Sequence, residues 1–590
     1  MLPYLVPAMF ISVGWFLHEP ATLLMSSLLI FYAIFLAINN SNFRGKIKFL
    51  NAIILFVPFS YLISGIINSQ SIESLVLGGY KRNYGLASFV AFAIIFIVAS
   101  AGKTKVKDFV NYGLIGTIVL ANIYGYTQYF DKDPFPWSNP LDAVSLTLAN
   151  PNFASAFFGC TTVAILYKLR QIKILKIRLI FLALLFSSIF LTFQTKSLQG
   201  ILLILISFSV YLFILNLRKV GNKFRIINYL ILISVPTLSV VFMSIFRLDR
   251  FNKLQDKILT EGSILQRLDY WKTGIKIWYD HFLFGIGADQ FQRFAAYYRT
   301  PEQVVRDGNL VIPDKAHNVV IDHLANGGIF AGLAWVLFLI SIFYCIIRLI
   351  KSNIHNIDDV AVLSGIWTAY VFQSMISPDH IVLTVIGVLS AGLLYSIYVS
   401  ELEIEDTKMI KVQFKNGPLF LKMVIYFLLI FSLFFYSKAL SANISGKQIM
   451  NGKITGGDNY LNVLNSWPND ELTETMGVDI LRDINNCAFV EIIADRLIQI
   501  DDRSSQAWYM KAVCANVNRD FLSAIKNIEQ SLKFDPLNTF YLVAKAKLEI
   551  AANQLDNAAS TVAKVKSINP TEAEIAALES SITVLRKKTE

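Results

Sequence analysis

The chain has 590 residues, of which 55% are hydrophobic and 16% are charged, and its mean hydropathy is +0.52. Typical soluble domains carry about 25% charged residues, so this composition excludes an ordinary soluble protein. The formal net charge of +11 could reflect nucleic-acid binding or the charge asymmetry of membrane loops, and the positions of the basic residues decide between the two.

Long apolar segments run from the start of the chain to about residue 440. Residues 198–217 contain no charged side chain, and such a stretch is about long enough to cross a bilayer as an α-helix. The first apolar segment lacks a basic leader and a small-residue cleavage site, so we interpret it as a span and not as a secretory signal. The sequence predicts thirteen spans: 3–17, 20–38, 50–67, 84–100, 109–129, 152–168, 177–194, 198–217, 226–246, 318–347, 360–376, 381–399 and 418–438.

The connections between these spans alternate in charge. Strongly basic connections fall in every second gap as far as the ninth span, namely RGKIK (44–48), KTKVK (103–107), KLRQIKILKIR (168–178) and RKVGNKFR (218–225). Of the later alternate gaps, 348–359 is only weakly basic and 400–417 is mixed. Basic loops stay in the cytoplasm, so we expect a cytoplasmic N-terminus. The external segments are then 68–83, 131–151, 195–197, 247–317, 377–380 and everything after 438. In this interpretation, the positive net charge comes mostly from the cytoplasmic loops, and we expect no nucleic-acid partner.

The connection at 247–317 is too long to be a simple link, because loops beyond about 15 residues are usually functional or disordered. Leu268, Trp271, Ile275 and Trp278 recur within it at helical spacing. This pattern predicts an amphipathic helix that lies on the membrane surface, with its aromatic residues as an interfacial anchor.

The tail (439–590) has a soluble composition and an internal repeat. Pro536 and Pro570 are thirty-four residues apart, and similar successions of aromatic and small residues precede both. The period and pattern resemble those of tetratricopeptide helix pairs. Such arrays often bind proteins along a concave face, so we expect residues 440–590 either to hold a protein partner or to form a rigid cap that binds nothing.

These segments together predict an all-α fold, a polytopic membrane helix bundle with a large external loop and a C-terminal α-helical repeat domain. We divide the chain into an N-terminal transmembrane bundle (1–246), a large extracytoplasmic loop (247–317), C-terminal transmembrane helices (318–438) and extracytoplasmic repeats (439–590).

Polar residues gather in the external connections, which all lie on one predicted face of the membrane. They include the cations Lys81, Arg82, Lys196 and Arg267, and a histidine, His317, that stands where the large loop enters a span. Arginine binds phosphate through bidentate, charge-assisted bonds. A histidine with a pKa near neutrality can take a proton from a hydroxyl group. The pattern favours a site for an anionic substrate at the membrane surface.

Each of these residues also has a simpler explanation. The two cations of the first loop could snorkel at a helix end, and Arg267 could pair with Asp269 or with a lipid phosphate. His323 lies six positions after His317, about 240° around a helix, so we interpret it as structural. No third ligand accompanies Asp314 and His317 at metal-binding spacing, so we expect no metal.

The segment RLDYWKTGIKIWYDHFLFGIGADQF (267–291), followed by KAHNVVIDHLANGGIFAGL (315–333), resembles the large-loop signature of the O-antigen ligase and polymerase superfamily. NPNFAS (150–155) and the first-loop Arg82–Asn83 pair also match, and the likeness covers about residues 1–440. Two positions depart from the family pattern. Lys196 stands where a Ser-Arg pair is common, and Phe282 replaces a proline. The matching elements of the loop are Arg267, Trp271, HFLFGIG (281–287), Phe291, His317–Asn318 and Gly327–Gly328.

The resemblance implies a metal-independent, cofactor-free, inverting glycosyltransferase with a GT-C-like bundle in a bacterial inner membrane. Its donor would be an undecaprenyl-diphosphate-linked glycan. The catalytic residues would be His317, as the base on the acceptor hydroxyl, and Arg267, which stabilises the leaving group. The residues implied to bind the diphosphate are Arg82, Lys196 and Lys81, and those implied to support the site are Asn318, Asn152 and Trp271.

Other functions remain open at this point. A polymerase would extend the lipid-linked glycan, whereas a ligase would transfer it to a glycan, lipid or protein acceptor. A lipid-linked sugar transporter would carry charges within its spans and inverted repeats, and neither is evident in 198–217 or 381–399. A membrane scaffold would leave Arg267 and His317 dispensable.

Overall fold

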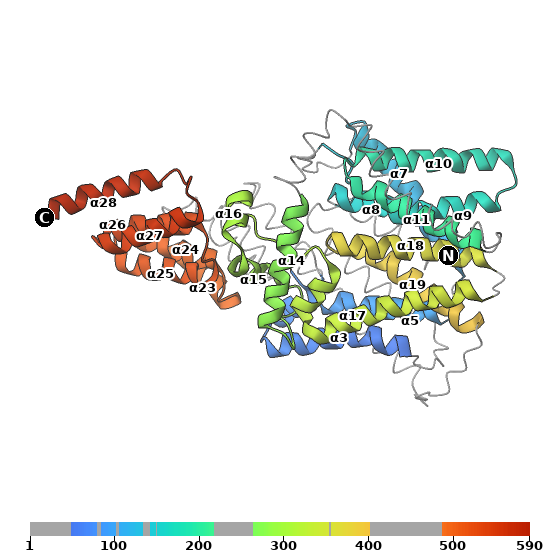
Figure 1. Ribbon diagram of the computed structural model, residues 1–590, viewed down its shortest axis with the longest axis horizontal. Helices are drawn as coiled ribbons and strands as arrows, with labels where there is room; N and C mark the ends of the chain where they lie inside the picture. The colour runs from blue at the N-terminus through green and yellow to red at the C-terminus, as the bar shows by residue number, and fades with distance from the viewer. Residues whose placement is uncertain are drawn as a thin grey trace.

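The computed structural model of the protein describes residues 49–79, 84–101, 105–133, 142–148, 150–217, 263–352, 356–401 and 487–589. Every regular element within these ranges is helical (Figure 1). The predicted spans 3–17, 20–38, 226–246 and 418–438 lie outside the described residues, as do Lys81 and Arg82.

The predicted spans that fall within the described ranges all coincide with helices. The spans at 109–129 and 152–168 are each divided, the first into η3 (Phe109–Ile115) and α7 (Gly116–Tyr129) after the short α6 (Val106–Asp108), the second into α8 (Pro151–Thr161) and α9 (Val163–Gln171). α5 (Leu86–Ser100) is apolar but shorter than a full span. Six helices of the described ranges are long and apolar enough to cross a membrane: α3 (Phe49–Ile67), α10 (Leu175–Gln194), α11 (Leu198–Leu217), α17 (Val319–Lys351), α18 (Ile357–Ile376) and α19 (Ile381–Glu401).

The chain is therefore a polytopic helical membrane protein, and the total of thirteen spans stays a prediction. Its helices differ in how much of their surface faces outward. Within the most apolar 18-residue stretch of each helix, 83% of α19 is buried in the protein, compared with 22% of α10. α19 thus lies at the centre of the bundle and α10 at its margin, where its apolar side chains face the lipid.

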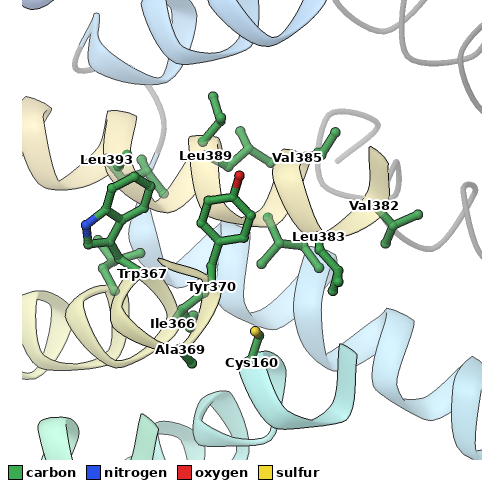
Figure 2. Close-up of a cluster of buried hydrophobic side chains, with 14 of the residues drawn as sticks. Cys160, Ile366, Trp367, Ala369, Tyr370, Val382, Leu383, Val385, Leu389 and Leu393 are labelled. Carbon is green, nitrogen blue, oxygen red and sulfur yellow. The ribbon is translucent and has the colours of Figure 1, made fainter. Parts of the chain in front are cut away.

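The bundle core lies between α18, α19 and α8. Trp367 and Tyr370 of α18 pack against the side chains of α19, and Cys160 approaches from α8 (Figure 2). The ring of Tyr370 lies over Gly387, where any side chain would overlap it. Large aromatic rings packed against a glycine bring α18 and α19 close together, which fixes the turn between them at one end of the bundle.

The large loop forms a layer across that end of the bundle. α14 (Ser263–Asp280) runs across the ends of the bundle helices, and α15 (Phe291–Tyr298) and α16 (Pro301–Asp307) lie between it and the tail (Figure 1). The face of α14 that packs inward carries Tyr270, Gly274 and Ile277, all buried. Leu268 and Ile275 of the predicted apolar stripe are exposed instead. The stripe is therefore not the packing face, and its outward position suits contact with lipid headgroups.

The described part of the tail consists of consecutive antiparallel helices with a repeat. α24 (Ser505–Val517) and α25 (Phe521–Phe534) recur as α26 (Thr539–Ala551) and α27 (Leu555–Ile568), with an offset of 34 residues at both ends of both helices. α23 (Cys487–Ile500) precedes them and α28 (Ile575–Thr589) follows. The helix pairs have the predicted period, while their assignment to the tetratricopeptide class stays a prediction.

Candidate functional site

Several helix ends meet around the start of α17, at the bundle end that is predicted to be external. Asn318 caps this helix, since its side-chain oxygen accepts hydrogen bonds from the backbone N–H groups of Val320 and Ile321. Its amide group also donates to the carbonyl of Met375 at the end of α18, at 3.1 Å. One asparagine thus starts α17 and joins it to α18. The supporting role in the site that the resemblance implies for Asn318 stays a prediction.

His317 stands immediately before this cap, in a backbone conformation that non-glycine residues seldom adopt. Its φ is +57°, its side chain is half-buried, and its ring packs edge-on against Tyr270 of α14, with 5.1 Å between centroids. Since α17 begins at Val319, the helical angle predicted between His317 and His323 does not apply. A left-handed residue next to a helix cap is held in a single orientation by its surroundings, as is common at functional sites.

His323, which we interpreted as structural, is buried within the bundle. Its Nδ1 lies 2.8 Å from the hydroxyl of Tyr61 on α3. Its ring also packs against those of Phe89 and Trp335. A histidine with a hydrogen-bonded nitrogen and aromatic neighbours is a packing residue, and we leave it out of the candidate site.

Arg267 lies on α14 three residues before Tyr270, on the same side of the helix. Its guanidinium is half-buried, and burial lowers its pKa from the ordinary value. The pairing with Asp269 considered above does not occur. Asp269 instead accepts from Lys272 at 3.2 Å and from Arg306 at 2.8 Å. Arg267 makes no ion pair with any residue that the structure describes, so its charge is available to an anion.

Trp271 also presents a polar group in this region. Its indole Nε1 is buried and makes no hydrogen bond within the described ranges. Buried tryptophan N–H groups usually find an acceptor. Trp271 therefore has a donor to offer beside Arg267 and Tyr270, in keeping with its predicted supporting role.

The two glycine motifs of the loop and the span fit against each other. α17 is interrupted at Gly328, which has a φ of +69° and lies so close to the carbonyl of Leu283 that a side chain would not fit. The interruption leaves backbone N–H and C=O groups of α17 without partners in the helix, and the HFLFGIG segment forms hydrogen bonds with them. Ile286 donates to the carbonyl of Ala325 at 3.0 Å, Gly287 to that of Asn326 at 2.9 Å, and Ile329 to that of Phe282 at 2.9 Å. The span predicted at 318–347 is thus a broken helix with a loop bonded into the break.

Asp289 joins three segments behind His317. Its Oδ2 accepts from the backbone N–H of Gly79 at 2.8 Å and of Tyr84 at 3.1 Å, and its Oδ1 accepts from the ammonium of Lys315. Both partners of this ion pair are buried. Gly79 and Tyr84 flank the segment that carries Lys81 and Arg82, and Lys315 precedes His317 by two residues. The carboxylate of Asp289 therefore links the first of the predicted external loops, through Gly79 and Tyr84, to the segment that carries His317.

Sequence reasoning missed this ion pair, and it assigned no role to Asp379, although SPDH (377–380) is predicted to be external. Asp379 is buried in the turn between α18 and α19, where the hydroxyl of Tyr370 donates to its Oδ2 at 3.2 Å. Burial raises the pKa of Asp379 to about 7, against the opposing effects of hydrogen bonds from Tyr370 and Thr384 and the charge of Lys315. The signal that could have identified these charged residues is their closeness in sequence to the motifs. Asp289 follows Gly287 by two residues, Lys315 precedes His317 by two, and Asp379 directly precedes His380.

Asn152 and Lys196 lie at the same end of the bundle. Asn152 belongs to the first turn of α8, where its backbone N–H donates to the capping side chain of Asn150. The next residue, Phe153, packs against the ring of His380 beside Asp379. Lys196 occupies the turn between α10 and α11 with a φ of +57°, and its exposed ammonium lies 3.3 Å from Asp142.

The structure thus brings His317, Arg267, Trp271 and Asn318 to the junction of α14 and α17, and it places Asn152 and Lys196 at the same bundle end. Fold and site together define a polytopic helical membrane protein with several cationic residues at one end of its bundle.

Residues 180–336 match a family model described as O-Antigen ligase. The match covers α10, α11 and the loop through His317 to the middle of α17, and it supports the O-antigen ligase superfamily, with a ligase- or polymerase-type activity on lipid-linked glycans. No curated protein matches the chain.

Proposed function

We propose that the protein is a metal-independent, inverting glycosyltransferase that moves a glycan from an undecaprenyl-diphosphate carrier to an acceptor hydroxyl in the bacterial inner membrane. The observation that carries the proposal is the contact between His317 and Tyr270. It sets a histidine at the head of a membrane helix next to α14, which carries an arginine with no ion pair in the described ranges, Arg267, one turn away.

The reaction follows from these positions. The imidazole of His317 takes the proton of the acceptor hydroxyl as its oxygen forms a bond to the anomeric carbon. The bond from that carbon to the diphosphate oxygen breaks, and undecaprenyl diphosphate leaves with the electron pair. Attack opposite to the leaving group inverts the anomeric configuration.

The cations act on the leaving group. Arg267, half-buried and free to bind an anion, stabilises the negative charge that grows on the diphosphate, and Lys196 and the Lys81–Arg82 pair neutralise its remaining charge. The indole N–H of Trp271 donates to a substrate oxygen. Lys196 supplies a point charge without the fork of an arginine, so we assign it the weaker part in binding.

The donor explains why these residues stand at a membrane boundary. Its polyprenyl chain lies in the bilayer while its sugars lie outside, so the bond to be broken is at the headgroup level. α14 runs across the bundle ends (Figure 1) and exposes the apolar side chains of Leu268 and Ile275, so we place it at that level. A polymerase that extends the lipid-linked glycan would use the same site, and the acceptor distinguishes the two activities.

The first test is replacement of His317 by glutamine in cells that produce the lipid-linked glycan. We expect transfer to fall about 10²- to 10⁴-fold, the usual contribution of a general base, and lipid-linked glycan to accumulate. Mass spectrometry of the lipid and product fractions measures both and identifies the missing acceptor. Asn318→Ala is unsuitable as the control because Asn318 caps α17. His281→Gln, in the same loop but packed against Phe294, is the matched control.

A second pair of variants tests the cation. Arg267→Ala should lose transfer, whereas Lys276→Ala, an exposed cation on the outer face of α14, should not. Chelation with EDTA should leave the wild-type rate unchanged. If His317→Gln and Arg267→Ala insert normally and transfer glycan at the wild-type rate, the proposed site is wrong.

A further inference from the structure

The acidic residues that end the helix pairs of the tail recur with the repeat and bind the large loop. Asp501 and Asp535 are 34 residues apart, at equivalent positions before α24 and α26. Asp501 pairs with Arg293 of α15, and Asp535 pairs with Arg299, which immediately follows α15. Two successive repeats therefore use the same position to hold two arginines of one short segment.

The Arg299–Asp535 pair is enclosed. The side chains are 2% and 1% exposed, and one guanidinium nitrogen lies 2.6 and 2.7 Å from the two carboxylate oxygens. A second guanidinium nitrogen donates to the carbonyl of Asn309 at 3.0 Å, and the side chain of Asn309 bonds the backbone N–H of Thr539 at 2.9 Å. A buried, multiply bonded ion pair is sensitive to the loss of either partner, which makes this a specific junction and not an incidental surface contact.

The short helix α16 connects this junction to the candidate site. Val304 of α16 is buried in the apolar core of the tail, together with Leu542 and Val562. On its other side, Arg306 donates to Asp269 of α14 at 2.8 Å. Asp269 is two residues from Arg267 and one from Tyr270, the residue that contacts His317. A continuous series of contacts therefore connects the repeats, through α16, to α14.

We propose that the repeat domain is a positioning element for the transferase site, in which Asp501 and Asp535 hold the loop so that α14 presents Arg267 and Tyr270 to His317. This proposal rests on the proposed function. Asp535, Arg299 and Arg306 are positioning residues, because they act through α14 and touch none of the reacting groups.

In this proposal, one edge of the tail contacts the large loop of the same chain. We predicted that residues 440–590 either hold a partner or form a cap that binds nothing. The edge of the repeats that carries Asp501 and Asp535 is instead occupied by the protein's own loop. A partner that competes for Arg293 and Arg299 would release α16 and switch the site off.

The test combines loss of the junction with its restoration by a crosslink. Asp535→Asn in the full-length protein, reconstituted in vesicles with lipid-linked glycan, should lower kcat/KM about 10- to 100-fold, the effect of a small misplacement of catalytic groups. A disulfide between Asn309→Cys and Thr539→Cys, whose side chains are in contact, should restore most of the rate after oxidation and lose it again after reduction. Cys487, which is partly exposed, is replaced by serine in all variants.

The matched control is Asp495→Asn, which removes an exposed acid from the tail that pairs only with Lys511 among the described residues. Crosslinking yield reports docking independently of activity. If Asp535→Asn lowers the yield but transfer stays at the wild-type rate, the repeats do not position the site, and the positioning proposal is wrong while the proposed function stands. If the wild type transfers no glycan while the cysteine pair at 309 and 539 crosslinks efficiently with Asp535 in place, the proposed function fails and the junction remains.

Discussion

The large loop is held at its two edges by different chemistry. At the bundle, the HFLFGIG segment is bonded through its backbone into the break of α17, and glycines allow the two chains to approach. At the tail, arginine side chains of the loop reach aspartates that lie more than 200 residues away in the sequence. The first edge depends mainly on shape and backbone hydrogen bonds, with one buried ion pair, Asp289–Lys315. The second depends mainly on charge, with one apolar contact through Val304. We therefore expect the bundle edge to resist small changes of solution conditions, and the tail edge to be the one that can open.

The first of two comparably large effects is expected at the break in α17. Gly328→Val places a branched side chain at a φ of +69° and against the carbonyl of Leu283, so both the backbone and the contact are strained. The φ alone costs about 1–2 kcal/mol, and overpacking adds about 1–3 kcal/mol. We expect the purified protein to be recovered in much lower yield, or to unfold at a clearly lower temperature in a detergent-based melting assay.

Gly116→Val, at a bundle position where an added side chain meets nothing within 4 Å, is the control for a glycine replaced in a helix. Comparable melting of the two variants would mean that the break in α17 is not needed for the loop to dock.

The next effect concerns Asp289, where charge is used at the bundle edge. Asp289→Asn keeps the shape of the side chain but leaves the buried ammonium of Lys315 without its partner. Removal of one partner of a buried ion pair costs about 3–5 kcal/mol. Because the same carboxylate holds Gly79 and Tyr84, we also expect KM for the lipid-linked donor to rise.

A double replacement separates the two effects. Asp289→Asn with Lys315→Met removes the unpaired charge and should regain stability, but it leaves the first loop without its anchor, so the high KM should persist. Recovery of both properties would show that Asp289 serves stability alone.

The contrast between the two edges also explains what the sequence could reveal. The spans are a local pattern, because hydrophobic periodicity depends on neighbouring residues. The 34-residue period likewise follows from the spacing of Pro536 and Pro570. The cap at Asn318 and the break at Gly328 were not predicted, since both residues entered only through the family resemblance. The Arg299–Asp535 pair joins residues 236 positions apart, and nothing local distinguishes those two side chains from other surface charges. His317 was singled out by its position where the large loop enters a span, and the family resemblance then implied its catalytic role. Its left-handed conformation belongs to no regular element and was not predicted.

The smallest expected effect is a pH dependence of the protein's stability, caused by Asp379 at the bundle edge. Burial raises the pKa of Asp379 to about 7, from about 3.9 in an unfolded chain. Between these values the folded state binds a proton that the unfolded state has released, so its contribution to stability is complete below about pH 4, falls as the pH rises to about 7, and is constant above. The wild-type melting temperature should decline from pH 5.5 to 7.5, and Asp379→Asn should remove part of that decline.

Lys315, Asp322, Tyr370 and Thr384 are the groups that act on Asp379, and the single replacement leaves them in place. Asp358→Asn, at the start of α18, is the control, because that acid is partly exposed and pairs with Arg170. If the wild type and Asp379→Asn decline in parallel, the carboxyl of Asp379 is ionised across this range and its burial is compensated by Lys315. The bundle edge would then hold a second buried carboxylate charge beside that of Asp289, and the distinction between the two edges would rest on the glycines and the backbone hydrogen bonds.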